Sequence, residues 1–275
     1  MTKVNLVSKY DAVIVGFGEI GKPIGQLLAG RYSVYPMDPE VYPEYNGDQI
    51  TCNFLHICIP GSLENFNEVV LGYIEKFKPS YTVIHSTVVP GTTRAIEEAQ
   101  EISKVIFTPA QGKHEGNKMK RDMLNYPKYV GATSSETAEK VKAHLEEVGF
   151  YTHILKNPEE AEWSKIVATT YFGLLIAWAQ ELERLCDKHE LDYGNITHFF
   201  PLAGDFTPPH FSGSIGGHCV LPNLKLWEKA NGGNRFIDLI KMSNNHKVAR
   251  DENDIVVDTS EKPKHSFTKR GKYKK

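Results

Sequence analysis

The stretch AVIVGFGEIG at residues 12–21 decides the fold. A run of β-branched residues leads into Gly16, and Gly18 and Gly21 follow at the spacing Gly-x-Gly-x-x-Gly before an amphipathic helical segment. The first glycine permits a tight turn, the second lets backbone N–H groups approach a pyrophosphate, and the third allows close helix–strand packing. A helix N-terminus at this point also favours an anion. The stretch therefore predicts a strand, a phosphate-binding turn and a helix, in that order.

An acidic residue follows at the distance that a dinucleotide-binding unit needs. Asp38 lies 22 residues after Gly16, at the end of the second β-rich run, where a carboxylate accepts hydrogen bonds from the hydroxyl groups of an adenine ribose. The same charge repels a 2′-phosphate, so we expect the cofactor to be NAD and not NADP. A turn-forming Asp before Pro39 is the alternative interpretation of this residue.

Strands and helices alternate through the first 155 residues. This order predicts an α/β fold, a Rossmann-type doubly wound parallel sheet with helices on both faces. A further run at residues 151–155 is expected to be one more edge strand. The expected strands are residues 12–16, 33–37, 54–59, 81–85, 104–107 and 128–131, and the helices between them include residues 20–29, 65–77, 92–99 and 135–148.

The pattern then changes to an all-α domain with one long central helix at residues 159–189, whose apolar residues recur at helical spacing. Its wide apolar face can be buried within one subunit or between two, and we expect a homodimer. Shorter helices are expected at residues 193–200, 224–230 and 235–248. The domains expected are residues 1–155, residues 156–250, and a disordered basic tail from 251 to 275.

Composition excludes several classes of protein. The formal net charge is -2, which gives no global basic field for nucleic acid. The four cysteines have no CxxC spacing, so we expect no metal site and no disulfide framework, and a cytoplasmic setting. The N-terminal residues lack the apolar core of a signal peptide, and the most apolar helical stretch, residues 171–179, is too short to span a membrane.

The stretch SIGGHCVLPN at residues 214–223 is the most informative part of the second half. Two glycines before Cys219 allow the backbone to approach a flat ligand closely. A thiolate at Cys219 is a nucleophile where positive charge stabilises it. A buried cysteine beside a turn is the alternative, and residue chemistry alone leaves both open. The role of His218 is open as well.

With this stretch included, the chain resembles the UDP-glucose/GDP-mannose dehydrogenase family, most closely its UDP-N-acetylhexosamine dehydrogenase branch. The resemblance covers about residues 10–248 and rests on several matches in the same order. These are ICIP at residues 57–60, HSTVVPGTT at 85–93, AEWSK at 161–165, QEL at 180–182, LD at 191–192 and the cysteine stretch.

The resemblance implies a double oxidation of the primary alcohol of a nucleotide sugar to a carboxylate with two NAD, through a thiohemiacetal and a thioester on Cys219. Lys165 is then expected to stabilise the developing oxyanion or hold an ordered water, and Thr87 to lie near the nicotinamide and hold that water. Glu115 matches the acidic residue that precedes a glycine in the family. The residues expected to bind the cofactor are Gly16, Gly18, Glu19, Ile20, Gly21, Asp38, Pro60 and Thr87.

The chain departs from the family pattern at several places. Thr169 stands where the family usually has Asn, Asn223 where it has Asp, and Ala110 replaces a glutamate. The chain also ends where the family begins a second Rossmann-like domain, which binds the nucleotide half of the substrate. Either the substrate is smaller, or a second chain completes the site, or activity has been lost. Two alternatives therefore stay open: a single-hydride dehydrogenase of the 3-hydroxyacid type, and a non-catalytic NAD-binding protein.

Overall fold

The computed structural model describes residues 7–38, 49–112, 118–202, 212–217 and 219–257. The chain forms two compact units. The first unit comprises Met1–Thr170 and Pro222–Gly233, and the second comprises Tyr171–Leu221 and Asn234–Lys275. The division falls inside the long helix, so its first turns pack with the first unit. The domain boundary at residues 155 and 156 stays a prediction.

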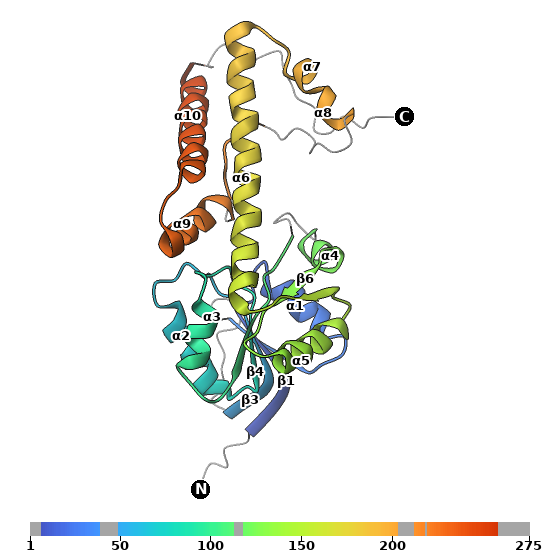
Figure 1. Ribbon diagram of the computed structural model, residues 1–275. Coiled ribbons are helices and arrows are strands. Elements are labelled where there is room, and N and C mark those ends of the chain that lie inside the picture. The colour runs from blue at the N-terminus through green and yellow to red at the C-terminus, as the bar shows by residue number, and fades with distance from the viewer. Residues whose placement is uncertain (1–6, 39–48, 113–117, 203–211, 218, 258–275) are drawn as a thin grey trace. The chain divides into compact units, whose positions relative to one another are not determined.

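A five-stranded parallel sheet forms the centre of the first unit, with strand order β2-β1-β3-β4-β5 (Figure 1). Val15 at the end of β1 pairs with Met37 of β2 and with Ile57 of β3, so the carboxyl ends of these strands meet at one edge of the sheet. Pro36, which has no N–H to donate, lies on the edge strand β2, where a proline costs least. The strands are β1 (Val7–Val15), β2 (Val34–Met37), β3 (Gln49–Ile57), β4 (Tyr81–Ile84) and β5 (Lys104–Phe107).

Helices cover both faces of this sheet, which confirms the predicted doubly wound architecture (Figure 1). Because side chains alternate along a strand, Ala12 and Ile14 of β1 pack in one apolar cluster while Val13 and Val15 pack in the other. The first cluster takes residues from α1 (Gly21–Leu28), α4 (Lys118–Asn125) and α5 (Ser135–Glu146); the second takes residues from α2 (Phe66–Phe77), α3 (Thr92–Glu98) and the start of α6 (Pro158–His189).

The strand expected at residues 151–155 is present, but it does not extend the main sheet. Its residues form β7 (Thr152–Ile154), which pairs in parallel with β6 (Lys128–Val130) in a separate two-stranded sheet. Gly131 and Phe107 exchange two backbone hydrogen bonds of 2.9 Å in antiparallel orientation, so the parallel ladder stops at β5. Helix α4 was not predicted, because its strongly charged sequence has few apolar residues to mark a helical face beyond the buried Met119 and Met123.

The second unit is all-helical among its described residues, as predicted. It contains the later turns of α6, α7 (Tyr193–Thr197), α8 (Phe199–Leu202), the start of α9 (Val220–Asn231) and α10 (Arg235–Val257). Helix α10 runs beside α6 (Figure 1), and a Cβ at Gly173 of α6 would lie 3.2 Å from Ile240 of α10. Helix α10 continues beyond the predicted end at residue 248, so residues 251–257 are helical and not part of a tail. Residues 258–275 lie outside the described part of the chain.

None of the described helices has both the length and the apolar character that crossing a bilayer requires.

Candidate functional site

The glycine-rich turn between β1 and α1 has the geometry that its sequence predicts. Gly16 has a φ of 85°, and a Cβ there would lie 2.9 Å from the carbonyl carbon of Cys58. A Cβ at Gly21 would lie 1.9 Å from the carbonyl oxygen of Gly16. At Gly18, by contrast, no described atom lies within 4 Å of the position of a Cβ. Packing therefore requires Gly16 and Gly21, whereas Gly18 leaves its backbone open to a ligand.

The first turn of α1 is open to an anion. Ile20 precedes the helix and makes no side-chain hydrogen bond to cap it, and no acidic residue occupies the first turn. Glu19 is exposed and Ile20 is half-buried. A pyrophosphate suits this end of the helix, because the N–H groups and the helix dipole there favour negative charge. The turn thus fits the diphosphate of a dinucleotide.

Asp38 lies beside this turn. Its Oδ2 accepts a hydrogen bond of 2.7 Å from the backbone N–H of Phe17, and the N–H of Gly16 donates to the carbonyl of Met37 at 2.9 Å. The carboxylate is also close to Tyr73 of α2, where burial and then the charge of Asp38 raise the pKa of the phenol. Asp38 therefore anchors the turn as well as standing at the end of β2 where an adenine ribose is expected.

Pro60 and Thr87 follow the neighbouring strands β3 and β4 at the same edge of the sheet. The hydroxyl of Ser86 donates to the carbonyl of Ile59 at 2.5 Å, and a Cβ at Gly61 would lie 2.0 Å from the carbonyl oxygen of Thr87. The two segments are therefore in direct contact. Pro60 is exposed and Thr87 is half-buried, so both border the same edge as the glycine turn.

Glu162 fixes the segment that follows Thr87, and sequence reasoning did not single it out. It is fully buried in α6, and its carboxylate accepts hydrogen bonds from the N–H of Gly91 at 2.6 Å, the N–H of Thr93 at 2.9 Å and the hydroxyl of Thr93 at 2.6 Å. Burial raises the pKa of this carboxyl, although these hydrogen bonds act in the opposite direction. An acidic residue one helical turn before Lys165 was the signal that could have identified it.

Lys165 faces the loop after β5. Its ammonium donates to the carbonyl of Ala110 at 2.8 Å, and the side chain is half-buried. Ala110 is itself buried, at the position where the resembling family has a glutamate. The structure therefore places Lys165 at the same edge of the sheet as the glycine turn and Thr87.

Thr169 and Asn223 form a hydrogen bond with each other. They are the two residues on helices that depart from the family pattern. The amide of Asn223 donates to the hydroxyl oxygen of Thr169 at 3.0 Å, and that hydroxyl donates to the carbonyl of Ile166 at 2.9 Å. Both side chains are buried. The single hydroxyl proton of Thr169 is thus donated within α6, and its oxygen accepts the hydrogen bond from the amide of Asn223.

Cys219 belongs to the second unit. It is a free, half-buried cysteine directly before the first residue of α9, and Gly217 before it has a φ of 78°, which favours glycine. Two buried side chains hold the preceding loop: Gln180 donates to the carbonyl of Gly213 at 2.9 Å, and Asn244 accepts from the N–H of Ile215 at 2.6 Å. Gln180 was part of a predicted match, whereas Asn244 carried no sequence signal.

Glu115 and His218 lie outside the described residues. Within the described ranges, no group of three or more His, Cys, Asp or Glu side chains is arranged to hold a metal ion.

No family model matches the chain. It is 25% identical over 237 residues to a UDP-N-acetyl-D-mannosamine dehydrogenase of Methanococcus maripaludis, in a match that covers 77% of the chain and 53% of that protein. The chain thus spans about half the length of this curated relative. The similarity to UDP-sugar dehydrogenases inferred from the sequence motifs is confirmed.

Solved structures agree on the fold. A UDP-D-ManNAc dehydrogenase from Pyrococcus horikoshii superimposes with a TM-score of 0.74 at 20% identity, covering 90% of the chain and 71% of that protein. A 3-hydroxyisobutyrate dehydrogenase from Mycobacterium tuberculosis superimposes with a TM-score of 0.64 at 14% identity, covering 90% of the chain and 95% of that protein. At these identities the likeness establishes the fold alone.

Proposed function

We propose that the chain is the cofactor-binding and catalytic part of an NAD-dependent dehydrogenase that oxidises a UDP-sugar. One observation carries the proposal. An open glycine turn, Asp38, Thr87 and the ammonium of Lys165 border one edge of a parallel sheet, in a chain whose curated relatives are named UDP-N-acetyl-D-mannosamine dehydrogenases. Ligands of open α/β sheets bind at the carboxyl ends of the strands.

NAD, when bound, supplies the acceptor for each hydride. In this proposal the glycine turn and the first turn of α1 bind its diphosphate, Asp38 accepts hydrogen bonds from the adenine ribose, and Pro60 and Thr87 border the nicotinamide. The negative charge of Asp38 repels the 2′-phosphate of NADP, so it selects NAD.

The oxidation proceeds in two hydride transfers. The first removes a hydride and a proton from the primary alcohol and gives an aldehyde. The thiol of Cys219 then adds to the aldehyde carbon to form a thiohemiacetal, and the second hydride transfer, with loss of the hydroxyl proton, gives a thioester. Water hydrolyses the thioester to the carboxylate and releases the thiol. Lys165 stabilises the oxyanion that develops in these steps.

The variant Cys219→Ser tests the covalent steps. A serine hydroxyl is a far weaker nucleophile than a thiolate, so we expect the variant to lose acid formation while it keeps NAD binding. The products of wild type and variant are compared by mass spectrometry after incubation with NAD and UDP-N-acetylmannosamine. Unchanged acid formation by the variant contradicts the thioester mechanism.

One observation favours a second candidate, a single-hydride dehydrogenase of a small 3-hydroxyacid. A 3-hydroxyisobutyrate dehydrogenase shares the fold over 90% of the chain, with a TM-score of 0.64. Such a reaction needs no cysteine, so Cys219→Ser would then leave the turnover of 3-hydroxyisobutyrate unchanged.

We also propose that the protein is a homodimer. Tyr171, Trp178 and Leu185 of α6 recur every seven residues and are each 44% exposed or more. A seven-residue apolar repeat on a helix suits packing against a second helix. A monomeric mass by light scattering at micromolar concentration would count against a dimer. A dimeric mass that Trp178→Glu leaves unchanged would count against this face of α6 as the interface.

A further inference from the structure

Side chains bind three consecutive carbonyl groups in the segment that follows β5. His85 and Lys128 donate to the carbonyl of Thr108, Lys128 donates also to the carbonyl of Pro109, and Lys165 donates to the carbonyl of Ala110. The distances are 2.9, 3.1, 3.1 and 2.8 Å in that order. We call residues 108–110 the carbonyl strap. Lys128 and Lys165 both donate to this short segment, which is unusual because two ammonium charges repel each other.

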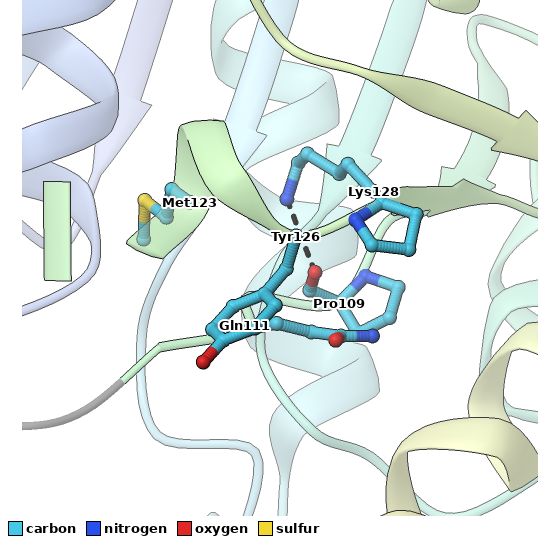
Figure 2. Close-up of a pocket in the computed structure, with 6 residues that line it drawn as sticks. Pro109, Gln111, Met123, Tyr126 and Lys128 are labelled. Carbon is cyan, nitrogen blue, oxygen red and sulfur yellow. Dashed lines mark hydrogen bonds between the residues drawn. The ribbon is translucent and has the colours of Figure 1, made fainter. Parts of the chain in front are cut away.

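Lys128 is almost completely buried, at 3% exposure. Figure 2 shows its side chain reaching toward Pro109, beside a small pocket that Gln111, Met123 and Tyr126 also line. The pKa of Lys128 is lowered to about 7, chiefly by burial; Cys58 opposes this lowering and the charge of Lys165 adds to it. A buried lysine on two carbonyls has no access to substrate, so it can act on the site only through the strap or through its charge.

A chain of buried histidines holds the strap from the other side. Nδ1 of His85 lies 2.9 Å from the carbonyl oxygen of Thr108 and 2.8 Å from its hydroxyl oxygen. Because the carbonyl can only accept, we assign the proton to Nδ1 of His85, and its Nε2 then accepts from Nδ1 of His56 at 2.9 Å. Nε2 of His56 then accepts from Nε2 of His144 at 3.2 Å. Burial lowers the pKa of His56 and of His85 well below 6.5, so both rings are neutral and their tautomers are fixed. Lys128 is therefore the titrating group among the side chains on the carbonyl of Thr108.

We propose that Lys128 is a positioning residue of this site, which holds the carbonyl strap and thereby sets the place and the charge environment of Lys165. The proposal rests on the proposed function, in which Lys165 is catalytic. Two consequences follow. Loss of the donors of Lys128 loosens the carbonyl that binds Lys165, and a permanent charge at position 128 makes Lys165 lose its proton more readily. Among the described residues, the charged or titratable groups around Lys128 are Lys165, Cys58, His56 and His85, together with Tyr126, which lines the same pocket.

Two variants separate these consequences. Lys128→Met removes donors and charge, and we expect kcat to fall about tenfold to 100-fold, because misplacing a catalytic group costs this much. The KM for NAD should change less than about twofold, since the strap is not part of the glycine turn. Lys128→Arg keeps the donors and is always charged, so kcat below pH 7, where Lys128 is charged as well, should recover to within about threefold of wild type. Lys104→Met, at an exposed lysine of β5, is the matched control.

The pH profile distinguishes positioning from a merely structural role. Above pH 7 the wild-type Lys128 is already largely neutral. Lys128→Met should therefore leave unchanged the pH at which kcat falls on the alkaline side of its pH profile. Arginine stays charged, so Lys128→Arg should move that limb to lower pH. The labelling of Lys165 by an amine-specific acylating reagent, followed by peptide mass spectrometry across pH, should shift in the same direction.

The labelling experiment needs no turnover, so it separates this proposal from the proposed function. If wild type makes no NADH with any UDP-sugar, the proposed function fails. The coupling of Lys128 to Lys165 still stands in that case if Lys165 is labelled at lower pH in Lys128→Arg than in wild type. The positioning role is overturned if the kcat of Lys128→Met equals that of wild type. It is also overturned if the pH dependence of Lys165 labelling is the same in Lys128→Arg as in wild type. If Lys128→Met does not fold, the labelling of Lys128→Arg still decides.

Discussion

The amide of Asn223 donates a hydrogen bond of 3.0 Å to the hydroxyl oxygen of Thr169, and both side chains are buried. Each residue departs from the pattern of the family that the sequence resembles, which has Asn at the position of Thr169 and Asp at the position of Asn223. The two departures compensate each other, because an amide donor meets a hydroxyl acceptor. The pair links α6 and α9 within the first unit without any charge.

This pairing predicts that the two residues are coupled in stability. Thr169→Val leaves a buried amide of Asn223 without its acceptor and should cost about 1–3 kcal/mol of unfolding free energy. Asn223→Leu in that background should add little, since the amide has already lost its partner. A double-mutant cycle measured by urea denaturation should give a coupling of about 1 kcal/mol or more. Additive effects of the two substitutions would contradict the pairing.

Glu162 should matter for stability, although the hydrogen bonds described for its carboxylate come from uncharged donors. Glu162→Ala leaves two backbone N–H groups and a hydroxyl of the turn before α3 unpaired, and each such loss costs about 1–3 kcal/mol. Glu162→Gln keeps one acceptor oxygen and should cost less. Thermal unfolding of both variants checks this order. The exposed neighbour Glu160 provides the control, because Glu160→Ala removes one surface contact; a greater loss for Gln than for Ala at 162 would be inconsistent with the hydrogen bonds described.

Stability should fall in mild acid because of the buried histidines. Burial lowers the pKa of His144 to about 4 and that of His56 and His85 well below the ordinary 6.5. The unfolded chain therefore binds protons first, so this part of the stability is present above pH 6.5 and is lost as the pH falls from there toward 4. Glu162, with its raised pKa, acts in the opposite sense.

For His144 the loss at pH 5 is about 2 kcal/mol. Urea denaturation at pH 7.5 and at pH 5 measures it. His144→Gln can still donate to His56 but takes up no proton, so it should flatten the pH dependence. The exposed His153→Gln should leave the dependence as in wild type. An equal slope in His144→Gln and wild type would show that the pKa of His144 is not lowered.

Asp38 should control the choice of cofactor through its charge. Asp38→Asn keeps an acceptor for the N–H of Phe17 and removes the charge, whereas Asp38→Arg reverses the charge. We expect NAD to bind about tenfold or more weakly to Asp38→Arg and the ratio of NADP to NAD affinity to rise, with Asp38→Asn intermediate. Titration calorimetry with both cofactors measures the ratio. An unchanged NAD affinity in Asp38→Arg would mean that the carboxylate only anchors the turn.

The sequence predicted the parallel sheet and the glycine turn, because β-branched runs and glycines at fixed spacing act locally. It predicted Lys165 and Cys219 through ordered motifs. It could not predict that Thr169 and Asn223 bond to each other, since their contact joins α6 to α9, far apart in the chain. The separation of β6 and β7 from the main sheet is marked by the antiparallel bridge between Phe107 and Gly131, and the burial of Lys128, Glu162 and Asn244 depends on packing. From sequence alone, a lysine or a glutamate is predicted to be exposed, because such residues are rarely buried.

The measurement that tests the central claim most directly is the number of NADH molecules formed at 340 nm for each molecule of UDP-N-acetylmannosamine consumed by the purified protein. Two NADH per substrate, with a carboxylate as product, is the expected result. One NADH per substrate, with an aldehyde as product, would contradict the double oxidation through Cys219. Firm NAD binding without any NADH formed from UDP-sugars or 3-hydroxyacids would contradict the proposed dehydrogenase activity of the chain.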